Sequence, residues 1–249
     1  MRDMKALGID IGGSALKGAP VDLSTGRLLA SRLRIATPEN LTPRHMAAAV
    51  KALAAHFRWR GPIGIGFPGV IQGAHILTST NLHADFVGLD GARLFGRITG
   101  CRVTMINDAA AAAHAEMKFG AGRKARGKVL LLTLGTGIGS ALACQGVVVP
   151  MELGHLPWKG QFAEKRVSAA VRERKNLSWK EWGGRLRVYV GILEELFWPD
   201  LIIIGGGVSS KHAKFFKHVK ARARLVPAKF LNHAGIVGTA LSTAVRAAG

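Results

Sequence analysis

The sequence has few cysteines and no long apolar run. Its two cysteines, Cys101 and Cys144, are too few for a disulfide framework or a cysteine-based metal cluster, and they fit a reducing compartment. The longest apolar runs, "VLLLTL" and "LIIIGGG", are far too short to span a bilayer. The amino terminus, "MRDMKALGID", lacks the apolar core of a signal peptide. We therefore expect a cytoplasmic protein.

Acidic residues are scarce relative to basic ones. The chain has 35 lysines and arginines against 15 aspartates and glutamates, and this net charge of +20 is unfavourable in a compact chain unless an anion compensates it. The excess is concentrated in three stretches: 118–128 and 211–229 contain no acid, and 165–175 contains a single one. A run of charge is usually only a solvated face, but three such runs together indicate a polyanionic partner.

In the last basic stretch, a lysine at every third position predicts a basic stripe along one helix. The stripe consists of Lys211, Lys214, Lys217 and Lys220, and Phe215 and Val219 mark the buried face.

The 249 residues, 48% of them hydrophobic, are enough for one large domain or two lobes, and no linker or short repeat interrupts them. Apolar strands alternate with helical segments, which predicts an α/β fold with mostly parallel sheets. We expect helices near Pro43–Phe57, from Asp108, two across Phe162–Phe197, and one from Ile236, with strands at Ile63–Phe67, Cys101–Ile106 and in "DLIIIGGG".

A glycine-rich turn follows the first strand in "LGIDIGGSALKGAPVD", residues 7–22. Asp10 at the strand end, before Gly12, Gly13 and Ser14, is typical of a place where backbone N–H groups meet a phosphate. The alternative is a tight hairpin whose glycines serve only to adopt a positive φ.

Two later turns repeat this pattern. In "LGTGIGSAL" Thr136 stands among glycines, and "GGGVSS" (205–210) ends an apolar strand and opens a helix, where an anion can bind. Three such turns favour phosphate binding over plain turns. The first two share the order strand, turn, strand, which predicts two lobes around a central cleft: 1–107, with the helix 236–249 packing back on it, and 108–235.

Two further segments contain groups suited to catalysis or binding. In "MINDAAAAAHAE", Asp108 follows a strand and begins a helix, so it is a candidate general base for phosphoryl transfer to an alcohol, and the alternative is a helix cap. Both can be true of the pair, with Asn107 or a backbone group as the cap and Asp108 pointing outward. In "MELGHLPWKG", Glu152 and His155 stand together in a loop. A lone histidine is more often structural, but beside a glutamate the pair can equally hold two hydroxyls of a polyol.

The motifs "GIDIGGSALKGA", "GIGFPGVI", "NDAAAAAHAE", "LLTLGTGIGSAL", "ELGH" and "DLIIIGGGVS" occur in the order found in the ROK (repressor, open reading frame, kinase) sugar kinases, so the chain resembles that family over nearly its whole length. It is most similar to the branch of polyphosphate-using glucokinases and glucomannokinases. Typical members carry a cysteine-rich zinc motif after "ELGH", whereas "GHLPWKGQFAEKRVSAAVRERKNLSWKEW" has no cysteine, so we expect no zinc.

The resemblance implies a two-lobed, actin-like ATPase (ribonuclease H-like) fold. It also implies transfer of the terminal phosphoryl group of inorganic polyphosphate to the 6-hydroxyl of glucose, or of mannose. Asp108 would be the catalytic base, and Asp10 would position Mg²⁺ through water. The implied sugar contacts are Asn81, Asn107, Glu152, His155 and Glu164. The implied phosphate site consists of Asp10, Gly12, Gly13, Ser14, Lys17, Thr136, Gly137, Gly206 and Gly207.

Two departures from the family pattern bear on substrate choice. Ser14 replaces the more usual threonine and keeps the hydroxyl, while "LHADF" after Asn81 replaces a stretch resembling Asp-Lys-Ser-Trp and leaves glucose against mannose open. An ATP-dependent ROK kinase is the main alternative, and a non-catalytic polyphosphate-binding or sugar-sensing protein is a remote one. Asp10 lies too near the start for a preceding DNA-binding region, so we expect no specific nucleic-acid partner. We expect no membrane partner either, and a monomer or homodimer.

Overall fold

The structure is a computed structural model that describes residues 4–37, 42–79 and 82–244. The chain divides into two compact units: residues 1–115 with 233–249 form unit 1, and residues 116–232 form unit 2. The first passage between the units lies inside one helix, α3 (Asp108–Phe119). In the described part of the chain, no helix is both long and apolar enough to cross a membrane.

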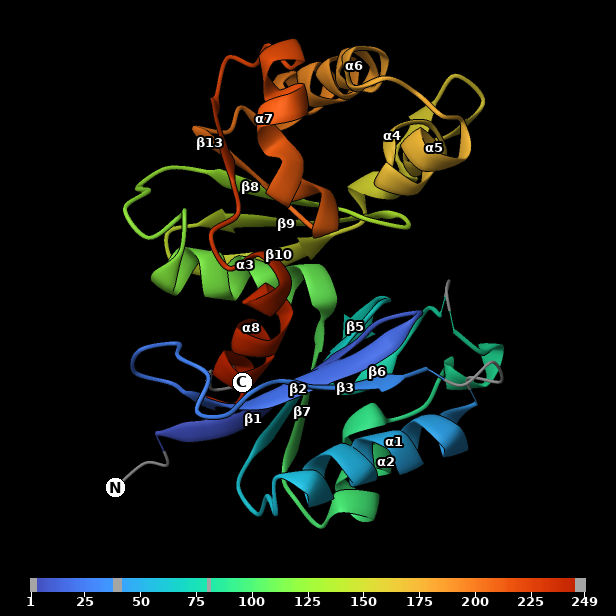
Figure 1. The fold of residues 1–249 in the computed structure, drawn as a ribbon, viewed down its shortest axis with the longest axis vertical. Coiled ribbons are helices and arrows are strands. Elements are labelled where there is room, and N and C mark those ends of the chain that lie inside the picture. Colours follow the sequence, from blue (N-terminus) through green and yellow to red (C-terminus); the bar gives the residue numbers. More distant parts are fainter. Residues whose placement is uncertain (1–3, 38–41, 80–81, 245–249) are drawn as a thin grey trace. The chain divides into compact units, whose positions relative to one another are not determined.

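Unit 1 is built on a five-stranded sheet with the order β3-β2-β1-β4-β7 (Figure 1). The strands β1, β2 and β3 pair antiparallel, whereas β1, β4 and β7 run parallel. Their bounds are β1 (Lys5–Ile11), β2 (Ala15–Asp22), β3 (Leu33–Ala36), β4 (Ile63–Phe67) and β7 (Val103–Asn107), and a small hairpin adds β5 (Ile71–Gln72) and β6 (His75–Ile76).

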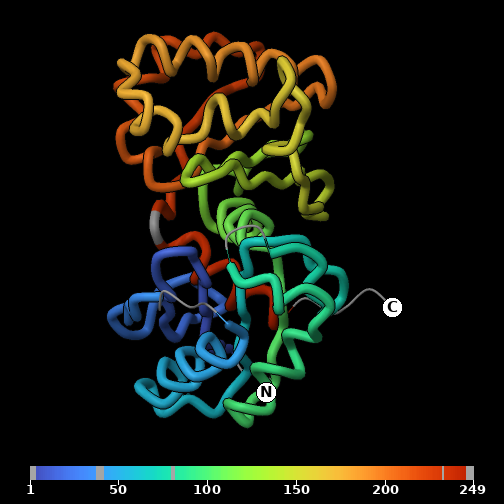
Figure 2. The backbone as a smooth tube through the Cα atoms, turned by 90° about the vertical axis from the view of Figure 1, so that its right-hand side faces the viewer, coloured from blue at the N-terminus to red at the C-terminus, as the bar shows by residue number. Residues whose placement is uncertain are grey.

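Helices cover both faces of this sheet (Figure 1). On one face lie α1 (Pro43–His56) and α2 (Gly91–Thr99), and on the other lies α8 (Ala234–Ser242). Strand alternation divides β1 accordingly: Leu7 and Ile9 pack in the core with α1, while Gly8 and Asp10 face α8. Figure 2 shows α8, in red, among the blue and teal segments of unit 1.

Glycines let α8 approach the sheet closely. A Cβ on Gly8 would collide with the carbonyl oxygen of Ile236, and one on Gly64 would collide with that of Thr239. These strand glycines serve backbone contact with a helix rather than a turn. As a result, the helix lies directly over the carboxylate of Asp10.

Unit 2 repeats the same topology in its own sheet, with the order β10-β9-β8-β13-β14. The first three strands pair antiparallel, and β8, β13 and β14 are parallel. The bounds are β8 (Val129–Leu134), β9 (Ile138–Cys144), β10 (Val147–Met151), β13 (Leu201–Gly205) and β14 (Arg224–Pro227), and a two-stranded piece contains β11 (Pro157–Trp158) and β12 (Gln161–Phe162). The helices are α4 (Glu164–Val167), α5 (Ala169–Arg174), α6 (Trp179–Phe197) and α7 (His212–Phe215).

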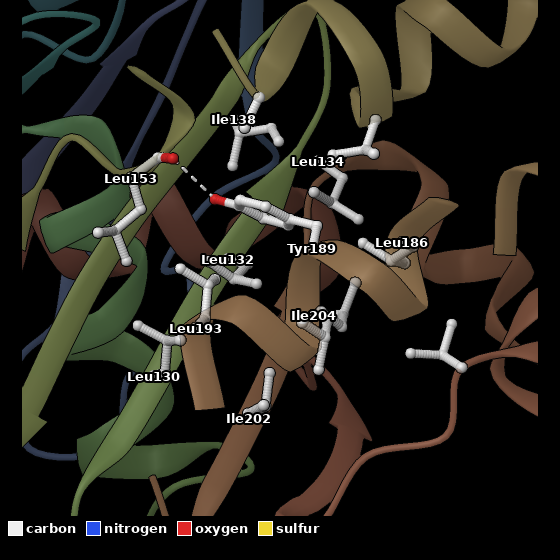
Figure 3. Packing of buried hydrophobic residues seen from close by; sticks show 14 of the residues in the cluster. Leu130, Leu132, Leu134, Ile138, Leu153, Leu186, Tyr189, Leu193, Ile202 and Ile204 are labelled. Atoms are coloured by element: carbon white, nitrogen blue, oxygen red, sulfur yellow. Dashed lines mark hydrogen bonds between the residues drawn. The ribbon is translucent and has the colours of Figure 1, made fainter. Parts of the chain in front are cut away.

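The core of unit 2 lies between α6 and the strands β8 and β13 (Figure 3). A capping box starts α6, because Ser178 and Glu181 each accept a backbone N–H of the other. Fully buried Tyr189 of α6 packs among leucines and isoleucines, and its hydroxyl donates to the carbonyl oxygen of Leu153 at 3.0 Å. A buried hydroxyl with a partner avoids the cost of an unmade hydrogen bond.

Three details of secondary structure differ from the sequence predictions. The sheets are mixed rather than mostly parallel, because each of the first two glycine-rich turns closes an antiparallel hairpin. The segment Phe162–Phe197 holds three helices, since Ser168 is extended between α4 and α5. The predicted basic helix is three short pieces, Gly207–Lys211 and Phe216–His218 of 3-10 type and α7 between them; Phe215 and Val219 are buried as expected.

Candidate active site

Two acidic residues predicted for catalysis lie at one edge of the unit 1 sheet. The strands β1, β4 and β7 are parallel, so their carboxyl ends meet at this edge and bring Asp10 near the start of α3. Gly66 of β4 stands between them: a Cβ there would lie 3.8 Å from Oδ1 of Asp10 and 3.8 Å from Cα of Asp108. The structure therefore places the two predicted acids on either side of one glycine.

Asp10 is a partly buried carboxylate beside a helix terminus. Burial raises the pKa of its carboxyl, and Lys17, opposite it across the β1–β2 hairpin, lowers that pKa. A Cβ on Gly235, in the first turn of α8, would lie 2.7 Å from Cγ of Asp10. The positive end of the α8 dipole therefore also favours the charged form.

The turn after β1 contains Gly12, Gly13 and Ser14. Thr37 fixes this turn with two hydrogen bonds. Its hydroxyl donates to the oxygen of Gly12 at 3.2 Å, and its N–H donates to the oxygen of Ser14 at 3.2 Å. The positive φ values of glycines in the described chain fall at other positions, so this turn does not use its glycines for that purpose. Gly13 is exposed and leaves its backbone open to a ligand, whereas the N–H of Gly12 already donates to the oxygen of Ala15 at 3.0 Å.

Asn107 and Asp108 make different contacts at the start of α3. The side chain of Asn107 is buried; its oxygen accepts from the N–H of Ala110 at 3.0 Å, and its amide donates to the oxygen of Gly69 at 3.1 Å. Asn107 therefore caps the helix and keeps one N–H and one lone pair for a ligand. Asp108 is partly exposed, and its Oδ1 accepts from the N–H of Ala109 at 2.7 Å.

The predicted sugar contact Asn81 lies outside the described residues. The unusual segment that follows is described: His83 accepts from the N–H of Asp85 at 3.3 Å and starts a short 3-10 helix, Ala84–Phe86. Phe86 is fully buried and packs on Phe67, with ring centroids 5.2 Å apart. This segment is therefore anchored in the core of unit 1.

In unit 2, the turn Gly135–Gly137 lies next to an acidic side chain. The N–H of Gly135 donates to the oxygen of Gly137 at 3.1 Å, which leaves Thr136 at the exposed tip. A Cβ on Gly137 would collide with Oε2 of Glu164, whose side chain is 12% exposed. Gly137, which was predicted to bind phosphate, and Glu164, which was predicted to bind the sugar, are thus direct neighbours.

Glu152, His155 and Glu164 form an electrostatically coupled group in unit 2. Nδ1 of His155 lies 3.8 Å from Oε2 of Glu152, and the His155 ring packs on Phe162 at 5.0 Å between centroids. Burial raises the pKa of Glu152, His155 lowers it, and Glu164 raises it. Burial and Glu164 together also raise the pKa of Tyr189. Two carboxylates and an imidazole together can accept from and donate to several hydroxyls.

Gly206 and Gly207 connect β13 to a 3-10 helix. Gly206 has a φ of 80°, and a Cβ there would collide with the backbone of Leu134, so glycine is required on both counts. The Ser209 hydroxyl donates to the oxygen of Gly206 at 2.7 Å. The short helix that follows holds the turn against β8, the strand that precedes Thr136.

Gly235 and Tyr189 were missed by the sequence reasoning. Gly235 touches Asp10 from more than 200 positions further along the chain, and Tyr189 lies within the field of Glu164. The only local signal was the segment "AGIVGTAL", whose small residues are typical of close helix packing.

Comparisons with known proteins identify the family and the fold of the chain. The profile of the ROK family matches residues 6–165. A polyphosphate glucokinase of Mycobacterium tuberculosis (strain CDC 1551 / Oshkosh) is 40% identical over 238 residues, 95% of this chain and 90% of that protein. The crystal structure of an inorganic polyphosphate/ATP-glucomannokinase from Arthrobacter sp. strain KM is 41% identical, with a TM-score of 0.94 over 98% of this chain and 100% of that one.

A more distant structure shares the fold alone. The ROK family glucokinase from Streptomyces griseus, crystallised with glucose and AMPPNP, is 22% identical, with a TM-score of 0.79 over 95% of this chain and 98% of that one. These similarities confirm the expected α/β fold, which is the two-lobed, actin-like fold of such sugar kinases.

Proposed function

This chain belongs to the ROK family, and we propose that it is a polyphosphate-dependent hexokinase that phosphorylates the 6-hydroxyl of glucose. Such an enzyme is a phosphotransferase with an alcohol as acceptor. The observation that carries the proposal is identity of 40–41% over almost the full length of two kinases that are named for their use of polyphosphate. The proposed place of action is the cytoplasm, which two free cysteines fit.

In the proposed reaction, Asp108 is the general base. Its carboxylate would accept the proton of the 6-hydroxyl while that oxygen attacks the terminal phosphorus. The bond from this phosphorus to the next bridging oxygen breaks, and the polyphosphate leaves one unit shorter. Supporting this role, Asp108 is partly exposed and stands at the carboxyl edge of parallel strands, where ligands of α/β proteins bind.

Recognition of the sugar is assigned to a set of hydrogen-bonding side chains. Glu152, His155 and Glu164 supply two carboxylates and an imidazole in unit 2, and Asn107 keeps spare hydrogen-bonding capacity in unit 1. Asn81 completes the proposed set. A polyol with several hydroxyls needs such alternating donors and acceptors, and each unmatched one costs about 1–3 kcal/mol.

Recognition of the phosphates is assigned to the three glycine-rich turns. Their members are Gly12, Gly13, Ser14, Lys17, Thr136, Gly137, Gly206 and Gly207. Glycine backbone, two hydroxyls and one ammonium suit an anion. The catalysis would consist mainly of positioning and charge neutralisation.

The residues present fit a magnesium ion. Asp10 is a partly buried carboxylate, which burial alone would tend to protonate and which Lys17 and the α8 terminus help to keep charged. Mg²⁺ is commonly held by one or two carboxylates together with substrate phosphates and water. Asp10 would hold the ion, through water. When bound, the ion would neutralise charge on the transferred phosphoryl group and the leaving chain.

A matrix of donors and acceptors tests this function. Initial rates would be measured with ATP, GTP and polyphosphates of several lengths, each against glucose, mannose, fructose and glucosamine. We expect the largest kcat/KM for polyphosphate with glucose. The ATP-dependent alternative, suggested by the name of the Arthrobacter enzyme, predicts ATP as the better donor and is accepted if polyphosphate gives no turnover. If mannose is the better acceptor, the proposed sugar substrate changes and the rest of the proposal stands.

A further inference from the structure

Two of the three basic stretches meet at one tryptophan in unit 2. Cζ of Arg172, from stretch 165–175, lies 3.7 Å from the centroid of a Trp179 ring, and Nζ of Lys214, from stretch 211–229, lies 6.0 Å from it. Trp179 also stacks on Phe215, with ring centroids 6.0 Å apart and an angle of 17° between the planes. The indole is therefore fixed by the core and holds a cation from each stretch.

Three lysines of stretch 211–229 lack an acidic partner in the part of the chain that the structure describes. Lys211, Lys214 and Lys217 are exposed, and among the described residues no carboxylate lies within 4.0 Å of them. By contrast, Lys165 is paired with Glu164 at 3.2 Å. The Nε of Arg172 is buried without a hydrogen-bond partner. Its guanidinium stacks on the Trp179 ring, and this planar group matches the geometry of phosphate.

Both basic stretches are attached to the turns assigned to phosphate. The N–H of Ala170, in α5, donates to the oxygen of Gly135 at 3.1 Å, so the helix that holds Arg172 is anchored on the Thr136 turn. The segment that holds Lys211 and Lys214 begins directly at Gly206–Gly207. Each basic stretch is therefore directly connected, by a hydrogen bond or along the chain, to a turn assigned to phosphate.

We propose that Arg172, Trp179, Lys211, Lys214 and Lys217 form a track that binds the distal phosphates of a long polyphosphate chain. We call this surface the Trp179 track. The inference rests on the proposed function and specifies which basic surface carries the donor, since stretch 118–128 is not part of it. One lysine falls in each of three consecutive short helices: Lys211 ends the first 3-10 helix, Lys214 lies in α7, and Lys217 lies in the second 3-10 helix.

The test compares two charge reversals of equal size. Lys211→Glu/Lys214→Glu alters the track, and Lys124→Glu/Arg126→Glu alters exposed cations of stretch 118–128 by the same charge. We expect the KM of long-chain polyphosphate to rise about tenfold in the track variant and less than twofold in the control. The KM values of tripolyphosphate and glucose should stay within about twofold in both variants, because a short chain does not reach the track.

Salt dependence gives a second measurement on the same variants. Binding of a polyanion releases counterions, so the logarithm of KM for the long chain should rise linearly with the logarithm of salt concentration. Loss of two phosphate contacts should reduce that slope by about one to two. Dissociation constants for the long chain, measured by calorimetry without sugar, should change in parallel with KM.

Several outcomes would overturn the track. These are equal rises of KM in the two variants, equal rises for long and short chains, or an unchanged long-chain KM in the track variant. Equally strong competition by single-stranded RNA and by polyphosphate of equal charge would also overturn it, because the surface would then bind polyanions in general. Failure of the proposed function is distinct, because wild-type enzyme would then show no turnover with polyphosphate at all.

Discussion

Gly235 lies against the carboxylate of Asp10 so closely that a Cβ would stand 2.7 Å from Cγ and 2.8 Å from Oδ2 of the aspartate. The two residues come from opposite ends of the chain, one from β1 and one from the first turn of α8. The helix therefore sets the position of the proposed magnesium ligand. A change at Gly235 should act on the reaction through Asp10.

We predict that Gly235→Ala lowers kcat/KM at least tenfold and raises the Mg²⁺ concentration needed for half-maximal rate. The new methyl group must displace the Asp10 carboxylate, and a shift of 1 Å in a catalytic group can cost about a hundredfold. Gly184→Ala in α6 is the matched control, because a Cβ there meets nothing within 4 Å. It should keep full activity and gain about 0.5–1 kcal/mol of stability. An unchanged Mg²⁺ requirement in Gly235→Ala would contradict the link to Asp10.

Asp108→Asn should retain the fold and sugar binding but lose activity. The amide oxygen can still accept the N–H of Ala109, so the start of α3 is preserved, while the proton acceptor is removed. General-base catalysis contributes about 10²–10⁴-fold, and kcat should fall in that range. Circular dichroism and glucose binding by calorimetry check the fold. If kcat stays above a tenth of the wild-type value, Asp108 is not the base.

Glu152→Gln should raise the KM of the sugar much more than that of the donor. Below the raised pKa of Glu152 the wild-type carboxylate is protonated and loses an acceptor, so the sugar KM should rise as the pH falls towards that pKa. The variant should lack this acidic limb. Equal effects on the KM values of sugar and donor would instead indicate a structural role.

His155→Ala separates the histidine from its neighbour. His155 lowers the pKa of Glu152, so its removal should move the acidic limb of the sugar KM to higher pH.

The raised pKa of Glu152 also makes stability depend on pH. Glu152 favours the folded state below its ordinary pKa of 4.5, and that contribution is lost as the pH rises through the pKa of the folded state. At neutral pH, Glu152→Gln should therefore have a higher urea midpoint of unfolding than the wild type.

Glu116→Gln should destabilise unit 2. The buried carboxylate accepts the N–H groups of Lys229 and Phe230 at 2.8 Å and that of Ala121 at 2.7 Å, and an amide cannot accept at both positions. The loss of one such bond to a charged group costs about 1.5–3 kcal/mol. Glu195→Gln, on an exposed position of α6, is the control and should change stability by less than about 0.5 kcal/mol. Equal urea midpoints for the two variants would refute this role.

The sequence by itself determined the family and the local elements. Six ordered motifs identified the ROK family, and short-range signals located Ile63–Phe67, the helix start at Asp108 and the buried face marked by Phe215. Strand alternation, helix caps and glycine-rich turns depend on neighbours within a few residues, so they can be read along the chain.

Only the tertiary structure decided which distant residues meet. The contact of Gly235 with Asp10, the hydrogen bond of Asn107 to Gly69, and the meeting of Arg172 and Lys214 at Trp179 all join separate segments. The mixed parallel and antiparallel pairing of both sheets also joins segments that are distant in the sequence. Local spacing carries no information about these pairs, because they are fixed by the packing of whole helices on sheets rather than by the conformation of one segment.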